Sequence, residues 1–444
     1  MGIVLTASRE TVSRPIGKGR SVEEEPHLDY NGLPFENRGT VRSRWRRVDQ
    51  SMKLGVLQER RPGETRVALV PAQVPLAANP KTGLEVLVEP GAGLHAGFSD
   101  AEYAEKGATI AADRAQVLAQ ADVLLCVRLP EDSETLVALN GSKTLIGMAD
   151  PLGNPQLIAD LAGRGLRVFA LELIPRITRA QNMDVLSSMA TVSGYKAVLL
   201  AANHLTRMFP MLMTAAGTIP PAKVLVLGAG VAGLQALATA RRLGAVTMGY
   251  DVRIAAREQV ESLGAKFVEL DLKADDAEGA GGYAKQLDQS FYDRQRQLLG
   301  RVIAECDVVI STAAVPGSKS PLLIDEAAVQ GMKSGSVIVD LAAERGGNCA
   351  LTIPDRTIQA HSITILGPTN LPASVPTHAS QLYSRNLVNF ITHLSKLGLL
   401  GGNSTETDDQ IARETLACDR GEVQSVPVRH KLGLPVKTPE AVGS

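Results

Sequence analysis

The chain has 444 residues, with 46 lysines and arginines against 47 aspartates and glutamates, so its balanced charge does not favour a nucleic-acid-binding protein. At roughly 150 residues per domain, this length allows two or three domains with well-buried cores. Only 3% of the residues are aromatic, which excludes a stacking surface for single-stranded nucleic acid. The four cysteines are far apart and form no C-x-x-C pair, so we expect buried thiols rather than a disulfide framework or a zinc site.

The N-terminal region differs from the rest of the chain. Residues 1–51 contain nine basic and seven acidic side chains and show no apolar periodicity. We therefore predict a disordered extension over residues 1–52. A targeting peptide is an alternative, although such peptides are poor in acidic residues. An upstream-extended start is another, because Met52 directly precedes the first expected strand.

We expect no segment to cross a membrane. A spanning helix needs about 20 consecutive apolar residues, and the best candidate, Val224–Ala240, has 17 uncharged residues that include three glycines. The glycine spacing indicates a strand, a turn and a helix instead. Any connection to a membrane is therefore expected to come through a partner.

From Lys53 onward, short strands rich in valine and leucine alternate with helices, which is typical of a parallel sheet covered by helices on both faces. Ser99 and Asp100 are suited to begin one of these helices. The strands expected in this first unit are Lys53–Leu57, Leu84–Val88, Val123–Val127, Thr144–Gly147 and Arg167–Leu171. We predict an α/β fold with two Rossmann-like, doubly wound parallel-sheet domains joined by long helices.

A helix expected over Asp184–Leu205 is long enough to bridge the two domains. The second unit begins at Lys223, and its further strands are expected at Val246–Tyr250, Lys266–Val268, Val308–Ser311, Ser336–Asp340 and Thr364–Leu366. A polar segment at about 271–297 is too long for a simple connection, so we predict a mobile loop. Ser380–Lys396 is expected to form a final helix. The predicted domains are 53–187 plus 376–427, 188–375 with this loop, and a tail at 428–444.

The clearest motif is Gly228-Ala-Gly230-Val-Ala-Gly233, which lies between an expected strand and an expected helix. In a dinucleotide-binding turn, the first glycine allows the tight turn, the second lets the backbone approach a pyrophosphate, and the third lets helix and strand pack closely. The helix N-terminus then offers unpaired N–H groups to the anion. The alternative is an ordinary glycine-rich turn between a strand and a helix.

An acidic residue at the end of the next strand favours dinucleotide binding. Asp251 follows Gly228 by 23 residues, close to the ~20 expected of the carboxylate that binds an adenosine ribose. A carboxylate there repels the 2′-phosphate of NADP. Arg253 is a reason for caution, because an arginine in this turn can accommodate that phosphate.

A polar turn precedes the bridging helix. Gln181 offers a donor and an acceptor, Arg176 donates, and Asp184 can hold Arg176, so this set could grip a planar carboxamide. The alternative is a helix N-terminus capped by Asp184, with the arginines in solvent. The histidines show no metal-ligand spacing, and we expect no metal site.

Several segments resemble a known family. KLGVLQERRPGETRVALVP, which begins at Lys53, and VEPGAGLHAGFSD resemble the N-terminal signature shared by alanine dehydrogenases and the NAD(H)-binding component of proton-translocating transhydrogenases. Five further segments resemble the transhydrogenase component in particular: PRITRAQNMDVLSSMATVSGYKAV, MTAAGTIPPAKVLVLGAGVAGLQA, GGYAK, SVIVDLAAERGGNC and QLYSRNLVN. The resemblance extends from about Lys53 to about Val426.

Two positions separate these relatives. Alanine dehydrogenases carry a lysine in a V-K-E-P turn and a histidine in an H-L-A turn for the substrate carboxylate and acid–base work, whereas this chain has Arg128 and Asp150 in the corresponding stretches. An amino-acid dehydrogenase needs a proton acceptor, but hydride exchange between two nicotinamides moves no proton at the reacting carbons and depends on positioning. An alanine-dehydrogenase-like oxidoreductase and a non-catalytic NAD-binding protein remain alternatives.

The resemblance also implies roles for individual residues. The residues implied to orient the nicotinamide and its ribose are Arg176, Gln181, Asp184 and Ser187. Those implied to bind the rest of NAD(H) are Ala229, Gly230 and Val231 at the pyrophosphate, within the turn that Gly228 and Gly233 shape, Asp251 and Arg253 at the adenosine ribose, and Gly282 and Gln295 beside a mobile loop around Tyr283. Ala314 stands where many relatives have leucine.

The resemblance further implies how the component works with others. It would form a homodimer and exchange hydride with NADP(H) on a partner component, while transmembrane subunits translocate protons. This chain would then be peripheral, on the cytoplasmic face of the inner membrane through those subunits, without binding nucleic acid.

Overall fold

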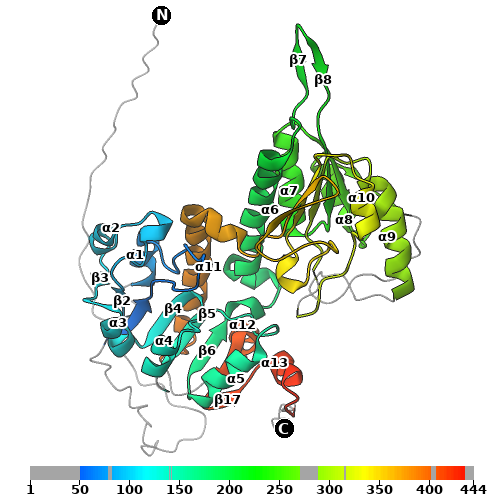
Figure 1. Ribbon diagram of the computed structural model, residues 1–444. Helices are drawn as coiled ribbons and strands as arrows, with labels where there is room; N and C mark the ends of the chain where they lie inside the picture. The colour runs from blue at the N-terminus through cyan, green and yellow to red at the C-terminus, as the bar shows by residue number, and fades with distance from the viewer. Residues whose placement is uncertain are drawn as a thin grey trace, which may run out of the picture. The chain divides into compact units, whose positions relative to one another are not determined.

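The computed structural model describes residues 51–78, 83–139, 141, 143–270, 289–314, 317–401 and 407–435. Figure 1 shows two large sheets within these residues, each flanked by helices. We call the region that carries the first sheet the first lobe (52–170 and 376–431) and the region that carries the second sheet the second lobe (223–366). The predicted α/β class with two doubly wound sheets is confirmed.

The first sheet has the strand order β17-β16-β6-β5-β4-β1-β2-β3. Strands β1 to β6 are parallel, whereas β16 is antiparallel to both β6 and β17. All five strands predicted in this unit form, and β1 begins at Met52, inside the predicted extension. The strands are β1 (Met52–Val56), β2 (Leu84–Val88), β3 (Thr109–Ile110), β4 (Val123–Arg128), β5 (Thr144–Met148), β6 (Arg167–Ala170), β16 (Leu416–Asp419) and β17 (Glu422–Val423).

The C-terminal region of the chain returns to this sheet, as Figure 1 shows by the position of α11 and β17. The Tyr383 hydroxyl on α11 donates to the Cys126 carbonyl oxygen at 2.7 Å, and Phe390 packs edge-on against Phe169 with ring centroids 5.7 Å apart. Residues 426–431, at the start of the predicted tail, form a helix. The helices are α1 (Val74–Ala77), α2 (Asp100–Glu105), α3 (Arg114–Gln120), α4 (Ser133–Ala138), α5 (Pro155–Gly163), α11 (Pro376–Lys396), α12 (Gln410–Thr415) and α13 (Val426–Lys431).

The second sheet has the order β11-β10-β9-β12-β13-β15-β14 and is parallel except for β14. Every predicted strand forms, and β14 is an unpredicted edge strand. The strands are β9 (Lys223–Leu227), β10 (Val246–Tyr250), β11 (Lys266–Phe267), β12 (Val308–Ser311), β13 (Val337–Asp340), β14 (Thr357–Ala360) and β15 (Ile363–Leu366). The helices are α7 (Val231–Arg242), α8 (Ala256–Ser262), α9 (Gln289–Ile303) and α10 (Glu326–Gln330).

Helix α6 (Val185–His204) matches the predicted bridging helix and packs against α7 and α11. It is also the helix, within the described ranges, that is long and apolar enough to span a membrane by length and composition alone, and 39% of its most apolar window is buried. The stretch Val224–Ala240 folds into β9, a turn and α7, so the strand, turn and helix predicted from its glycine spacing are confirmed. The predicted boundary between residues 187 and 188 lies within α6. The domain boundaries remain predictions.

An unpredicted hairpin precedes the second sheet. Strands β7 (Leu212–Thr214) and β8 (Gly217–Ile219) project away from that sheet in Figure 1. Its residues are exposed although several are apolar, with Met213 72% exposed. An exposed apolar hairpin of this kind is a candidate contact surface.

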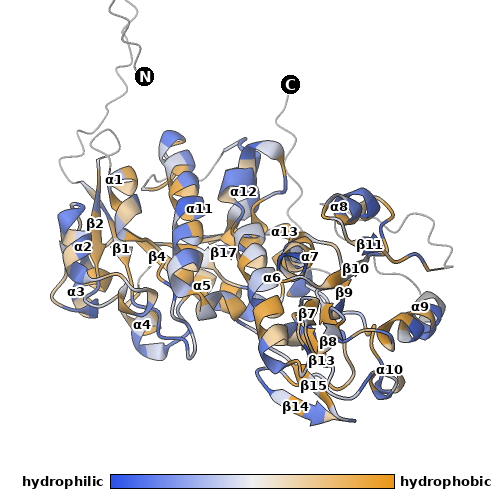
Figure 2. Cartoon of the chain, turned by 90° about the horizontal axis from the view of Figure 1, so that it is seen from above, coloured by the Kyte–Doolittle hydropathy of each residue, from blue (hydrophilic) through white to orange (hydrophobic). Residues whose placement is uncertain are grey.

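Both sheets are buried between helices. The sheet strands are mostly orange in Figure 2, while helices such as α11 carry both colours, as expected for one apolar and one polar face. The four cysteines are free and buried in these cores, which confirms the prediction of buried thiols.

Candidate functional site

The glycine motif forms a tight turn between β9 and α7. Gly228 has a positive φ of 96°, and a Cβ there would lie 2.7 Å from Thr312 Oγ1. A Cβ on Gly233 would overlap the Gly228 carbonyl oxygen, whereas a Cβ on Gly230 would meet open space. The turn geometry therefore suits the three predicted glycine roles, and the open space at Gly230 fits a ligand that approaches the backbone.

The turn lies at the point where the strand order reverses. β9 pairs with β10 on one side and with β12 on the other, and ligands of doubly wound sheets bind outside the carboxyl ends of the strands at this point. Gly230 is the N-cap of α7, and Val231 in its first turn is 39% exposed. The first N–H groups of a helix have no partner within the helix, which suits a pyrophosphate.

Asp251 reaches the same turn from the end of β10. Its Oδ2 accepts the Ala229 N–H at 2.8 Å, and both of its carboxylate oxygens accept from Arg253, at 2.9 and 2.8 Å. The Ala229 N–H is therefore engaged by Asp251, and the implied contact of Ala229 with the pyrophosphate stays a prediction. The guanidinium of Arg253 is thus paired with Asp251, the residue predicted to bind the adenosine ribose.

The polar turn before α6 shows the capping arrangement. Asp184 is the N-cap of α6, and its two carboxylate oxygens accept from the Ser187 N–H at 2.9 Å and the Ser187 hydroxyl at 2.6 Å. Gln181 and Arg176 are exposed. Asp184 thus caps the helix as in the alternative interpretation, while the exposed Gln181 amide is open to a ligand.

Two helices bring the predicted halves of the site together. A Cβ on Gly194 of α6 would overlap the carbonyl oxygen of Ala232 in the first turn of α7, so the helices cross directly beside the glycine turn. Ser187 lies two turns earlier on α6, about 10 Å along the helix axis. The polar turn and the glycine turn are therefore close enough for one extended ligand.

The remaining predicted contacts fall in three places. Gln295 lies within α9 and is fully buried, with its Nε2 donating to the Tyr250 hydroxyl at 2.7 Å, so residues 289–297 are helical and not in a mobile loop. Gln295 supports the strand that carries Asp251. Gly282 and Tyr283 lie outside the described residues. Ala314 is exposed at the carboxyl end of β12.

The sequence analysis missed a buried network at the end of β13. The fully buried Asp340 accepts hydrogen bonds from the Ser311 hydroxyl at 2.9 Å and the Thr352 hydroxyl at 2.7 Å, as well as from backbone N–H groups. The signal in the sequence was the pair Gly346 and Gly347, since two adjacent glycines indicate a turn with positive φ, and both have positive φ in the turn after β13.

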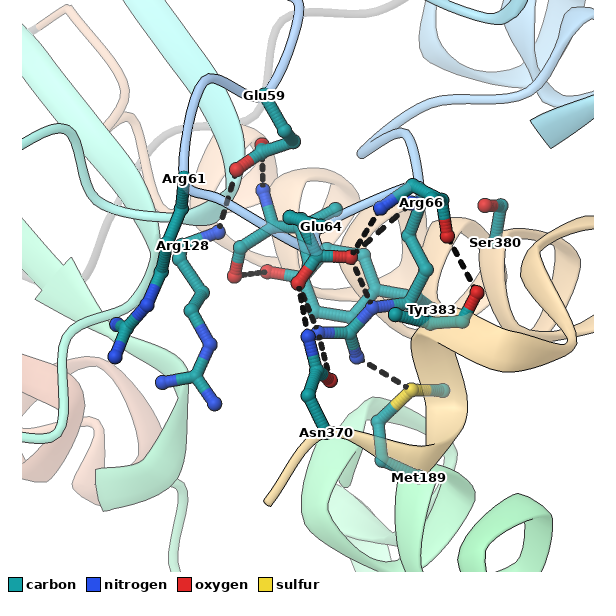
Figure 3. Close-up of polar contacts among 12 residues, drawn as sticks. Glu59, Arg61, Glu64, Arg66, Arg128, Met189, Asn370, Ser380 and Tyr383 are labelled. Atoms are coloured by element: carbon teal, nitrogen blue, oxygen red, sulfur yellow. Dashed lines mark hydrogen bonds and ion pairs between the residues drawn. The ribbon is translucent and has the colours of Figure 1, made fainter. Parts of the chain in front are cut away.

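The R-P-G-E-T-R motif forms a buried ion pair in the first lobe. Figure 3 shows the Arg66 guanidinium against the Glu64 carboxylate, with Nη2 to Oε2 at 2.6 Å, and Asn370 beside both. Burial alone would raise the pKa of Glu64, but the hydrogen bonds and charge of Arg66 hold it below its ordinary value. Arg66 Nη1 also contacts Met189 Sδ on α6 at 3.2 Å.

Two partly buried glutamates hold the backbone at the carboxyl edge of the first sheet. Glu59 accepts the N–H groups of Val127, at 2.6 Å, and Arg128, and burial raises the pKa of Glu59 to about 7 (Figure 3). Glu172 accepts the N–H groups of Ala149, at 2.9 Å, and Asp150, at 2.7 Å, and burial raises the pKa of Glu172 too. Each glutamate thus fixes the backbone at one of the two positions that separate this chain from alanine dehydrogenases.

These two positions face the second lobe. Asp150 pairs with Arg345, and Arg128 lies 3.9 Å from the Glu344 carboxylate. Arg128, Asp150 and Glu344 line a cavity of about 220 Å³ between the lobes. Arg128 and Asp150 are thus each paired with a charged residue of the second lobe.

Comparison with known proteins decides the family. The model of the alanine dehydrogenase/PNT N-terminal domain matches residues 55–193, and that of its C-terminal domain matches residues 197–425. The chain belongs to the alanine dehydrogenase/PNT family.

Members of this family include close relatives of the chain. It is 47% identical over 351 residues to the first part of the NAD(P) transhydrogenase alpha subunit of Rhodospirillum rubrum, covering 78% of the chain and 91% of the relative. A crystal structure of transhydrogenase from Sinorhizobium meliloti, 41% identical, superposes with a TM-score of 0.74 over 84% of this chain and 99% of that one. An L-alanine dehydrogenase structure, 24% identical and with a TM-score of 0.71, covers 86% of this chain and 99% of its own and shares the fold.

Proposed function

We propose that this member of the alanine dehydrogenase/PNT family is the NAD(H)-binding subunit of a proton-translocating transhydrogenase. The observation that carries the proposal is the crossing of α6 and α7 at Gly194, a point about 10 Å along the α6 axis from Ser187 in the polar turn's helix cap. Similarity to relatives named NAD(P) transhydrogenase subunits supports the same reaction. A glycine turn with Asp251 for one half of a dinucleotide and an exposed amide for the other fits a nicotinamide dinucleotide.

In the proposed reaction, a hydride moves from C4 of one dihydronicotinamide to C4 of an oxidised nicotinamide on the partner subunit. No proton is gained or lost at these carbons, so the protein must mainly orient and shield the two rings. The α7 N-terminus would hold the pyrophosphate, and the Gln181 amide would hold the nicotinamide carboxamide. Asp184 and Ser187 would then keep the Gln181 turn in place through the helix cap.

Nucleotide choice tests this proposal. NADH is expected to bind more tightly than NADPH, because a 2′-phosphate would approach the Asp251 carboxylate, whose partner Arg253 is already paired. Asp251→Asn should reduce the difference between the NADH and NADPH affinities by releasing Arg253 toward the phosphate, whereas Arg253→Ala should increase that difference. Fluorescence titration of both nucleotides measures this. Equal affinity of the unmodified chain for NADH and NADPH would refute the role of Asp251.

The proposed assembly includes a partner that binds NADP(H) and transmembrane subunits that translocate protons. This chain would then be peripheral, on the cytoplasmic face of the inner membrane. The packing of α6 against α7 and α11 supports a peripheral placement, because that apolar helix has protein neighbours. The Rhodospirillum rubrum relative is named as one portion of an alpha subunit, which supports an assembly of several chains.

The proposed homodimer would use the β7–β8 hairpin, where Met211, Met213 and Ile219 are 59%, 72% and 43% exposed. Met213→Asp is expected to shift the dimer toward monomer, because the dimer would bury the new charge. Light scattering during size-exclusion chromatography measures the mass. The control, Leu94→Asp, changes a similarly exposed first-lobe residue. A dimer unaffected by Met213→Asp would place the contact elsewhere.

A further inference from the structure

A single buried side chain holds the loop that follows β12. Asn348 is fully buried, and its amide makes three hydrogen bonds to this loop. Its Nδ2 donates to the carbonyl oxygens of Ala313 and Pro321, both at 2.8 Å, and its Oδ1 accepts the Ala313 N–H at 3.1 Å. One amide therefore ties the start of the loop to its end and uses both of its donor hydrogens.

The local sequence explains how Asn348 reaches this position. Gly346 and Gly347 have φ values of 92° and 77°, and a Cβ on Gly347 would lie 2.7 Å from Asp340 Oδ2. Asp340 Oδ2 accepts the N–H groups of Asn348, at 2.8 Å, and Cys349, at 3.0 Å. The two glycines turn the chain after β13, and the carboxylate fixes the backbone of Asn348 beneath the loop.

The loop lies beside the glycine turn. The Thr312 hydroxyl donates to the Gly228 carbonyl oxygen at 2.9 Å, and a Cβ on Gly228 would lie 3.1 Å from the Ala313 nitrogen. Ala314, the next residue, is exposed. A dinucleotide that places its adenosine ribose at Asp251 over β10 extends its other half across the switch point over β12. The Ala313–Ala314 backbone is thus placed under the nicotinamide half.

We propose that Asn348 is a positioning residue of the nucleotide site, which holds the Ala313–Ala314 backbone in the conformation that supports the nicotinamide half. This inference rests on the proposed function. Asn348 is too deeply buried to touch the nucleotide, so it acts through the loop alone. Lys431 from the first lobe also binds the loop, at the Gly317 carbonyl oxygen at 2.7 Å, so loss of Asn348 should displace the loop without releasing it.

Two substitutions at this position test the proposal. Asn348→Ala removes all three hydrogen bonds, while Asn348→Asp keeps the size and the acceptor but cannot donate to the Ala313 and Pro321 carbonyl oxygens. With saturating nucleotide, both variants should slow single-turnover hydride transfer by about 10- to 100-fold, because displacements near 1 Å at a reacting centre have effects of this order. NADH affinity should change by less than about fivefold, because the glycine turn and Asp251 are unaltered.

A matched control separates positioning from stability. Asp307 lies at the opposite, amino edge of the same sheet, where it binds Arg207 at 2.8 Å and the Lys223 N–H at 2.9 Å. Asp307→Asn should lower the Tm without slowing hydride transfer well below that Tm. Hydrogen exchange should show faster exchange of the Ala313 amide in Asn348→Ala and unchanged exchange in Asp307→Asn.

Each outcome bears on the inference. Asn348 variants that transfer hydride at the unmodified rate while folded, in a chain whose unmodified form binds NADH and transfers hydride, would overturn the positioning role and leave the proposed function intact. Rate losses in both Asn348 variants and Asp307→Asn, in proportion to the fall in Tm, would assign Asn348 a structural role only. An unmodified chain that binds no nicotinamide dinucleotide would overturn the proposed function and this inference with it.

Discussion

Gln181→Ala is expected to slow hydride transfer about 100-fold, because the nicotinamide would lose the amide that orients its carboxamide. NADH affinity should change little, since the glycine turn and Asp251 hold the other half of the dinucleotide. Gln181 is exposed, so the substitution should also leave the Tm unchanged. The measurement is single-turnover transfer at saturating nucleotide, with NADH affinity titrated separately.

Two substitutions at Asp184 provide the control for this result. Asp184→Asn keeps an N-cap oxygen and should preserve the Tm, whereas Asp184→Ala removes the cap and should destabilise α6 by about 1 kcal/mol. If Gln181→Ala transfers hydride at the unmodified rate, and only Asp184→Ala has an effect through a lower Tm, the turn is a helix cap without a role in orienting the nicotinamide.

Glu64→Gln is expected to lower the free energy of unfolding by about 3–5 kcal/mol, because it leaves the buried Arg66 charge without its partner. The urea midpoint of the first lobe's unfolding transition measures this effect. The control is Arg60→Ala, which breaks a pair whose side chains are 39% and 79% exposed and should cost less than about 1 kcal/mol. Equal small shifts for both variants would contradict a stabilising buried pair.

The same pair predicts a pH dependence. Because the folded-state pKa of Glu64 lies below its ordinary 4.5, its contribution to stability is present above that ordinary value and is lost as the pH falls through the folded-state pKa. As the pH falls through this range, the Glu64→Gln variant should lose less stability than the unmodified chain, because it has no carboxylate at this position to protonate. An acid unfolding profile of Glu64→Gln that parallels the unmodified profile would exclude Glu64 as a source of the pH dependence.

The sequence was sufficient for features that depend on local patterns. Buried parallel strands such as β9 and β12 are short apolar runs, and the glycine turn has a fixed spacing, so both kinds of feature could be predicted. Short exposed elements such as β7 and β14 have no such pattern, because long-range pairing forms them. Their existence depends on neighbours that the local sequence does not specify.

The candidate site shows the same division. Asp251 could be placed from its distance to Gly228, but its hydrogen bond to Ala229 depends on which loops meet at the edge of the sheet. Residues 271–297 were expected to be a loop because the segment is polar, yet residues 289–297 belong to α9, where Gln295 is buried against Tyr250. Asn348 could not be predicted as a loop anchor, since the contacts that define it join β12, β13 and the loop between them.

The most direct test of the proposed function is single-turnover hydride transfer between two bound nucleotides. The unmodified chain carries an oxidised NAD analogue of distinct absorbance and is mixed with an NADP(H)-binding transhydrogenase component that carries NADPH. We predict a rapid burst of reduced analogue that requires both proteins, together with no reduction of NAD by L-alanine. Absence of the burst when both nucleotides are bound, or reduction of NAD by L-alanine with the chain alone, would contradict the assignment.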